Sequence, residues 1–327
     1  MKRREREKTW FPPPIERTFT IKDTPNEDSA VAMKEKNLQV LAVFDGCGGI
    51  GSRRYALLDQ HTGAYLASHL YANEVKNWFN NNAKHFQKKG KFPRDIEKII
   101  KELFLSSGND FKKKYLDREE TIVVGRMVKT LPSTFAMALI EYHQKETIGT
   151  FLWAGDSRGY LLHPQKGLCQ LTKDDLISQD NAFENIYNDG PMSNYLNLDE
   201  PFIVNKVIGR FPETCIVITA TDGAFDYLPS PMHFEALLLD TMLQVDTMAH
   251  WEEKIVSHLK CITADDVTIL VQPIGFESFP SMKESFQNRF AYLNENYIYP
   301  AEKQHVNNTD KIHHLRKLWQ AYQKEME

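Results

Sequence analysis

Leu-Ala-Val-Phe-Asp-Gly-Cys-Gly-Gly, residues 41–49, is the most informative stretch of this sequence. Its four leading apolar residues indicate a buried strand that carries the Asp45 carboxylate at its end. The glycines that follow allow the backbone to turn sharply and to approach whatever the carboxylate binds. The stretch therefore predicts a strand that ends in a functional acid.

Acids occupy similar positions beside two other apolar runs. Residues 216–223 read Ile-Val-Ile-Thr-Ala-Thr-Asp-Gly, which places Asp222 at the end of a second strand, and Asp265 and Asp266 directly precede the apolar run 267–271. Each acid alone is typical of a solvated turn. Together they indicate a site for a hard cation, because magnesium and manganese prefer oxygen ligands.

Three further acids can join this group. Glu27 and Asp28 precede the first apolar strand, and Asp156 lies in a turn between two strand-like runs. Antiparallel strands can bring such ends to one edge of a sheet. Two carboxylates about 4 Å apart repel by ~4 kcal/mol at an effective dielectric of 20. A pair of divalent cations would remove that repulsion, generate a hydroxide nucleophile and bind a phosphoryl oxygen.

The order of apolar patterns predicts the fold class. Strand-like runs with short turn-rich spacers lie at 31–44, 133–163, 215–220 and 267–271, which favours antiparallel pairing. Helical patterns lie at 57–79, 93–115, 232–243 and 248–259. We therefore expect an α+β fold, with a sandwich of two antiparallel β-sheets flanked by pairs of helices.

The composition is ordinary for a globular protein, with 327 residues, 42% hydrophobic residues and 26% charged residues. A net charge of −4 gives no general attraction to nucleic acid or to a membrane surface. No apolar run reaches the length of a membrane span, and the N-terminus lacks the pattern of a signal peptide. We expect a cytoplasmic protein whose four cysteines form neither disulfides nor a metal-binding pair.

The chain divides into three parts by its composition. Residues 1–14 are expected to form a flexible tail, 15–275 a catalytic domain, and 276–327 an aromatic-rich extension that ends in an amphipathic helix. The helix begins near Asp310. Its apolar stripe consists of Ile312, Leu315, Trp319, Tyr322 and Met326. Two interpretations remain open: the stripe docks on its own domain, or it binds a partner.

The motifs, taken in order over residues 15–273, resemble those of the metal-dependent type 2C protein serine/threonine phosphatases, the PPM family. Gly155-Asp156-Ser157-Arg158 is identical to the family's turn, and six other segments match it more loosely. These segments are Asn26 to Ser29, Val43 to Gly49, Ser133-Thr134, Leu171 to Asp175, Thr221 to Asp226 and Asp265 to Thr268. Each match is weak alone, but seven in the family's order are not expected by chance.

The resemblance implies a binuclear magnesium or manganese centre at one end of the sandwich. It implies that Asp45 bridges the two ions and that the Gly46 carbonyl binds one, while Asp222 and Asp265 hold the other. Asp156 would contribute to a third, weaker metal site.

The resemblance also implies a reaction. Glu27 and Asp28 would act mostly through metal-bound water, and Asp45, Glu27 and Asp28 would form the catalytic set. A hydroxide bridging the two metals would attack phosphoserine or phosphothreonine in a phosphorylated protein, without a covalent phosphoenzyme.

The sequence departs from the family at the groups that bind and protonate the phosphate. Asp23 stands where the family usually has an arginine, so Lys22 or Arg17 is the candidate replacement. Lysine offers a point charge where arginine offers a fork. Arg53 and Arg54 are further candidates.

Two histidines of the family are also replaced, by Cys47 and Asp175. These changes leave two alternatives open: a pseudophosphatase that acts as a binding or regulatory module, and a phosphoesterase that acts on small molecules. The segment 180–205 is expected to form a flap beside the site and to influence substrate preference.

Overall fold

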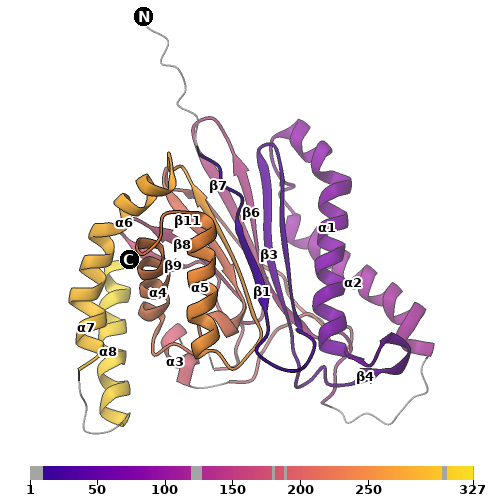
Figure 1. Cartoon of the computed structure of the whole chain (residues 1–327). Coiled ribbons are helices and arrows are strands. Elements are labelled where there is room, and N and C mark those ends of the chain that lie inside the picture. The colour runs from indigo at the N-terminus through magenta and orange to yellow at the C-terminus, as the bar shows by residue number, and fades with distance from the viewer. Residues whose placement is uncertain (1–9, 119–126, 179–180, 188–189, 304–307, 327) are drawn as a thin grey trace, which may run out of the picture.

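The computed structural model describes residues 10–118, 127–178, 181–187, 190–303 and 308–326. Within them two five-stranded antiparallel sheets lie face to face, with helices on both outer faces (Figure 1). The predicted α+β sandwich is therefore confirmed.

The first sheet contains the strand that ends at Asp45. Its order is β10-β7-β6-β3-β2. The strands are β2 (Asp28–Glu35), β3 (Leu38–Gly46), β6 (Ser133–Tyr142), β7 (Thr147–Ala154) and β10 (Asn205–Phe211). Strand β3 lies between β2 and β6 and is buried from Leu38 to Phe44, in agreement with the apolar run that ends at Phe44.

The second sheet contains the other two acid-bearing strands. Its order is β1-β12-β11-β8-β9. The strands are β1 (Ile15–Phe19), β8 (Arg158–His163), β9 (Gly167–Gln170), β11 (Cys215–Ala220) and β12 (Val267–Ile274). Between the two sheets lies an apolar layer that includes Val43, Ala136, Phe151, Val217 and Leu270.

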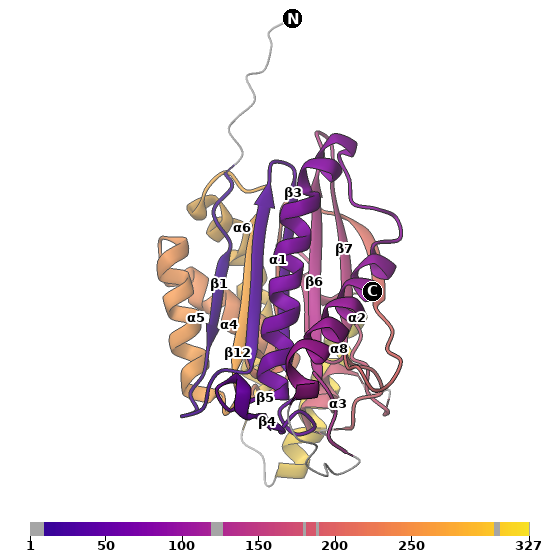
Figure 2. The same cartoon turned by 90° about the vertical axis from the view of Figure 1, so that its right-hand side faces the viewer.

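Helices α1 (Gly63–Lys89) and α2 (Ile96–Tyr115) pack together over the outer face of the first sheet (Figures 1 and 2). Helix α1 starts six residues later than the predicted 57–79 and continues to Lys89. The delay has a local cause, because a short hairpin of β4 (Arg54–Tyr55) and β5 (His61–Thr62) precedes it. Thr62 then caps the helix by accepting a hydrogen bond from the Tyr65 backbone N–H at 3.1 Å.

Helices α4 (Pro231–Leu243) and α5 (Met248–Ile262) cover the second sheet, close to the predicted ranges. Outside them lie α6 (Phe279–Leu293), α7 (Tyr299–Ala301) and α8 (Asn308–Met326), as Figure 1 shows. A short helix, α3 (Ala182–Tyr187), lies within the segment 180–205. Helix α6 was not among the helices expected from the sequence.

The apolar stripe of α8 packs within this molecule. Leu315, Trp319 and Tyr322 are 1%, 8% and 2% exposed and belong to the same core as α4 and the second sheet. Ile312 packs against that core, and the Met326 side chain lies outside the described part. The stripe of α8 therefore docks on its own domain, as the first of the two interpretations predicts, and it is not free to bind a partner.

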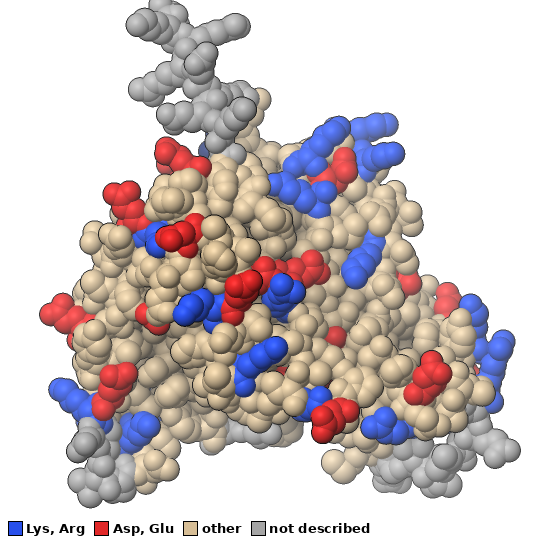
Figure 3. All heavy atoms as spheres, in the orientation of Figure 1, with Lys and Arg blue, Asp and Glu red and all other residues tan. Residues whose placement is uncertain are grey.

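The surface carries charges of both signs. Figure 3 shows acidic and basic side chains mixed over one face, with Lys and Arg gathered towards the end of α1, whose last turn contains Lys88 and Lys89. Among the described residues, no helix combines the length and the apolar character needed to cross a membrane.

Candidate active site

The acids identified in the sequence meet at one edge of the sandwich. Asp28 begins β2 and lies directly opposite Asp45 near the end of β3. Asp222 lies two residues after the end of β11, Asp265 lies two residues before β12, and Asp156 lies between β7 and β8. Because neighbouring strands are antiparallel, these ends and beginnings fall on the same side of both sheets.

Hydrogen bonds fix two of the acids at this edge, the first between the two sheets and the second within the first sheet. The Thr221 hydroxyl, next to Asp222, donates to the Asp28 carboxylate at 2.8 Å. The Ser133 hydroxyl on β6 donates to the backbone carbonyl of Asp45 at 2.8 Å. The positions of Asp28 and Asp45 therefore depend on residues of other strands, which hold the two acids in a fixed relation.

Burial and mutual repulsion raise the pKa values of Asp28, Asp45, Asp156 and Asp222. Burial, followed by the charges of Asp222, Asp28, Asp156 and Asp265, raises the pKa of Asp45 well above its ordinary value. These effects require the other four carboxylates to lie near Asp45. The site thus concentrates negative charge that a cation would stabilise.

Asp156 and Asp222 show the same effect. Burial and the charges of Asp226 and Asp265 raise the pKa of Asp222 to about 7. Burial and the charges of Asp222 and Asp174 raise the pKa of Asp156 to about 7. Each of these acids therefore loses its proton more readily when a positive ion is close.

Glu27 is held by three different elements. Its carboxylate accepts a hydrogen bond from the Thr62 hydroxyl at the start of α1, and its backbone N–H donates to Asp266 at 2.7 Å. Its backbone carbonyl accepts from the Gly46 N–H at 3.1 Å. Gly48 faces the same carboxylate, since a Cβ on Gly48 would lie 2.5 Å from Glu27 Oε2.

The two candidate phosphate-binding residues lie in different surroundings. Lys22 forms an ion pair with Asp265 at the acid edge. Although burial lowers the pKa of Lys22, the hydrogen bond to Asp265 and the neighbouring acids raise it overall. Arg17 lies on β1 and pairs with Glu252 of α5, so the structure does not bring Arg17 into the group of acids.

The donor chemistry fits a divalent cation, although the side chains do not surround one point. Among the described residues, no three Asp, Glu, His or Cys side chains are placed to hold one ion. However, Asp156 Oδ1 and Asp266 Oδ1 are buried and accept no hydrogen bond from any described residue. Buried oxygens without donors, in a group whose side-chain donors are all oxygens, are suited to magnesium or manganese.

Cys47 and Asp175, which replace two histidines of the PPM family, lie in different surroundings. Burial, with the charges of Asp45, Asp156 and Asp222, raises the pKa of the Cys47 thiol well above its ordinary value, so the thiol is protonated at neutral pH. Asp175 instead accepts hydrogen bonds from the Gly155 N–H and from the side chains of Asn194 and Asn205. Asp175 therefore connects the turn of Asp156 with the segment 180–205.

Sequence reasoning did not identify several supporting contacts, although it had named Asp266 among the acids. Thr62, Thr221 and Asp266 fix the acids, and a buried ion pair joins Arg158 to Asp174, with Nη2 2.7 Å from Oδ2. Arg158 and Asp174 belong to two of the motifs described above. Because these motifs are separate in the sequence, nothing in it predicts that the two side chains meet. Thr62 had a weak signal as a cap residue before the α1 pattern.

Comparison with solved structures shows which fold this is. Serine/threonine phosphatase Stp1 from Staphylococcus aureus matches with a TM-score of 0.57 and 15% identity, covering 84% of this chain and 99% of that chain. Phosphatase PstP/Ppp from Mycobacterium tuberculosis matches with a TM-score of 0.54 and 17% identity, covering 80% and 97%. The chain has the fold of the PPM serine/threonine phosphatases.

The likeness to the PPM phosphatases lies in the three-dimensional fold and in the order of the motifs. No family model and no curated protein matches the sequence. A PstP catalytic domain in complex with two manganese ions also shares the PPM fold, with a TM-score of 0.50 and 16% identity over 80% of this chain and 97% of that chain. At such identities the likeness establishes the fold, and the chemistry must be argued from this chain's own residues.

Proposed function

We propose that this protein is a metal-dependent protein phosphatase that hydrolyses phosphoserine and phosphothreonine in phosphorylated proteins. The observation that carries the proposal is the meeting of Asp28, Asp45, Asp156, Asp222 and Asp265 at one edge of a PPM-type sandwich. The two manganese ions in the PstP structure are consistent with it.

Two divalent ions, magnesium or manganese, would be held by Asp45 and the Gly46 carbonyl and by Asp222 and Asp265. Asp156 would contribute to a third and weaker site. When bound, the ions would supply an activated water as the nucleophile and would neutralise charge on the phosphoryl group.

The residues of this chain would orient the reactants. Thr62 and Asp266 fix Glu27, and Thr221 fixes Asp28, so these two acids are positioned to orient water. Lys22, beside Asp265, would attract the phosphate as a point charge. A lysine there gives less directional binding than the fork of an arginine.

The test is hydrolysis of p-nitrophenyl phosphate and of a phosphopeptide with manganese. Asp222→Ala should lower activity at least about a hundredfold, because metal catalysis contributes several kcal/mol and ~1.4 kcal/mol corresponds to tenfold in rate. Asp246→Ala is the matched control, since that side chain is 93% exposed and pairs only with Lys283 among the described residues.

Two results would contradict the proposal: no manganese-dependent activity, or equal activity in wild type and Asp222→Ala. Calorimetric titration with manganese tests the first alternative, and a screen of phosphopeptides against nucleotides and sugar phosphates tests the second. Tight manganese binding without turnover would indicate a binding module, whereas turnover of nucleotides or sugar phosphates in preference to phosphopeptides would indicate a small-molecule phosphoesterase.

A further inference from the structure

The short hairpin before α1 brings an arginine to the edge of the sandwich where the acids meet. Strands β4 and β5 pair so that Arg54 lies directly opposite Thr62, and opposite side chains of an antiparallel pair share one face. The Thr62 hydroxyl donates to the Glu27 carboxylate. The register therefore places Arg54 on the face that meets Glu27, at the end of the sandwich where α1 begins (Figure 2).

Electrostatic coupling also shows that the Arg54 guanidinium lies near the acids. Burial raises the pKa of Glu27, and the charges of Lys22 and Arg54 act in the opposite direction. Because Coulomb interactions weaken with distance, both cations lie close to Glu27. They come from different elements: Arg54 from β4, and Lys22 from the segment between β1 and β2.

Most of the hydrogen-bonding capacity of Arg54 is unused. Its Nη1 donates to the Gln60 carbonyl at 2.9 Å. Within the described part of the chain, the guanidinium makes no other hydrogen bond and has no carboxylate within ion-pair distance. A guanidinium carries several N–H donors in a planar fork, and Arg54 is exposed. The fork is therefore open to a ligand that arrives from solution.

The loop that holds Arg54 is strained. Asp59 and Gln60 have φ angles of 53° and 61°, in the left-handed region that residues other than glycine rarely adopt. The Gln60 N–H donates to the Tyr55 carbonyl at 3.1 Å, and the Gln60 carbonyl accepts from Arg54. Strain of this kind is concentrated at functional sites. The loop thus fixes the guanidinium before any ligand binds.

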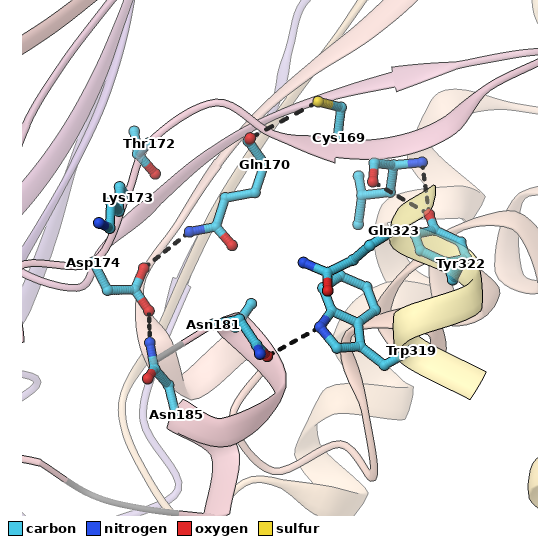
Figure 4. A pocket seen from close by; sticks show the side chains of 12 residues that line it. Cys169, Gln170, Thr172, Lys173, Asp174, Asn181, Asn185, Trp319, Tyr322 and Gln323 are labelled. Atoms are coloured by element: carbon cyan, nitrogen blue, oxygen red, sulfur yellow. Dashed lines mark hydrogen bonds between the residues drawn. The ribbon is translucent and has the colours of Figure 1, made fainter. Parts of the chain in front are cut away.

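Arg158, the buried arginine beside the same acids, is committed to Asp174. Its Nε and Nη2 atoms donate to Asp174 Oδ1 and Oδ2 at 3.0 and 2.7 Å. The Asp174 carboxylate also accepts from Gln170 and Asn185 at 2.9 and 2.6 Å, as Figure 4 shows. This carboxylate is therefore fixed in place, and Arg158 is not available to bind an anion.

The remaining arginines considered for the phosphate are engaged elsewhere. Arg17 pairs with Glu252. Arg53, which precedes Arg54, lies over the Tyr55 ring, with its Cζ 4.9 Å from the ring centroid. Of these four arginines, Arg54 thus combines a position at the acids with an open fork.

We propose that Arg54 binds the phosphate of the substrate through the fork of its guanidinium, beside Lys22. The fork matches two phosphate oxygens, whereas the ammonium of Lys22 acts as a point charge. This assignment rests on the proposed function, because the phosphate is that of a phosphoserine or phosphothreonine. Divalent ions in the metal centre would offset the charge of the acids, so that an anion could approach Arg54.

The test compares Arg54→Met and Arg54→Lys with wild type in two assays: phosphopeptide hydrolysis with manganese, and calorimetric titration of the manganese-loaded protein with inorganic phosphate. Arg54→Met should raise KM and weaken phosphate binding about tenfold or more, because it removes hydrogen bonds to a charged group. Arg54→Lys should give intermediate values, since it keeps the charge and loses the fork. Manganese affinity should stay within about twofold, because an exposed charge without an ion pair contributes little.

Arg53→Met is the matched control. It removes the same charge from the neighbouring residue, whose guanidinium lies over Tyr55. Its KM and its phosphate affinity should equal those of wild type. If Arg53→Met lost as much phosphate affinity as Arg54→Met, the effect would be one of general surface charge, and Arg54 would not be the phosphate-binding residue.

Two other results would overturn the role of Arg54 while the phosphatase proposal stands. One is a wild-type KM and phosphate affinity in Arg54→Met. The other is a loss of kcat and manganese affinity with phosphate affinity retained, which would show that Arg54 acts only through the hairpin and Glu27. If wild type hydrolysed no phosphopeptide, the phosphatase proposal would fail, and the phosphate titration alone would decide whether Arg54 binds phosphate.

Discussion

At the scale of single residues, two neighbouring glycines have different structural roles. A Cβ on Gly48 would lie 2.5 Å from Glu27 Oε2, whereas a Cβ on Gly49 would meet no atom within 4 Å. Gly48 therefore leaves room for the Glu27 carboxylate, and Gly49 does not contribute in this way. Both belong to the glycine-rich turn after Asp45.

This difference gives a matched pair of variants. Gly48→Ala should displace the Glu27 carboxylate and lower manganese-dependent activity by roughly tenfold to a hundredfold, as a misplacement of about 1 Å can do. Gly49→Ala should retain the activity of wild type. Steady-state hydrolysis of a phosphopeptide checks both, and melting temperatures confirm that the variants fold. Equal activities would contradict the assigned role of Gly48.

Lys22 and Arg17 form a second pair of variants. Lys22→Met should tighten manganese binding a few-fold, because it removes a positive charge that pairs with Asp265, and exposed pairs contribute about 0.2–1 kcal/mol. It should also raise KM for a phosphopeptide. Calorimetry with manganese and steady-state kinetics measure the two effects.

Arg17→Met is the control, because Arg17 pairs with Glu252 of α5. Its manganese affinity and KM should match those of wild type. If Lys22→Met changed neither quantity, Lys22 would have no role at the site. If Arg17→Met raised KM instead, Arg17 would be the phosphate-binding residue.

At the scale of elements, a buried polar cluster joins the C-terminal helices to the second sheet. Arg289 on α6 donates to Glu235 on α4 through Nε at 2.7 Å and through Nη2 at 3.0 Å. Tyr322 on α8 also donates to Glu235. The side chains of Arg289 and Glu235 are 4% and 0% exposed. Each charge can therefore be buried only because the other one balances it.

Breaking this pair should destabilise the protein strongly. Arg289→Met would leave the Glu235 carboxylate buried without its cation, which costs about 3–5 kcal/mol. Equilibrium urea unfolding measures the loss. Arg316→Met is the control, because its pair with Glu184 is more exposed and its removal should have little effect. Similar losses in both variants would contradict the interpretation.

The sequence patterns predicted elements unevenly, for physical reasons. Helices α1, α2, α4, α5 and α8 were expected because apolar residues recur at helical spacing on one face. Helix α6 was not predicted. Its aromatic residues, such as Phe279, Phe286 and Phe290, were interpreted by their abundance, and their spacing along the chain was not used. The hairpin before α1 was missed because its strands, Arg54–Tyr55 and His61–Thr62, are two residues each.

At the scale of the whole molecule, the C-terminal helices complete a core. Phe286, Leu293, Leu315 and Tyr322 belong to the same buried cluster as α4 and the second sheet. In Figure 1 these helices form an additional layer outside α4 and α5. The division into a domain 15–275 and an extension 276–327 stays a prediction, but the extension shares its core with the domain.

Deletion of residues 277–327 should therefore impair folding. The loss exposes apolar side chains of α4 that share a core with α6 and α8, and such surfaces promote aggregation. We expect aggregated protein in size-exclusion chromatography and a weakened near-UV circular dichroism signal. A monodisperse, cooperatively unfolding truncated protein would show that 276–327 is a separable extension.

The sequence by itself determined the α+β class and the strand-end positions of Asp45, Asp222 and Asp265, because apolar periodicity and glycine turns are local properties. Only the tertiary structure decided that Lys22 pairs with Asp265 and Arg17 with Glu252. It also decided that the α8 stripe is buried and that Arg158 meets Asp174. These contacts join residues from different elements, and which elements pack together is set by the folded core and not by local sequence.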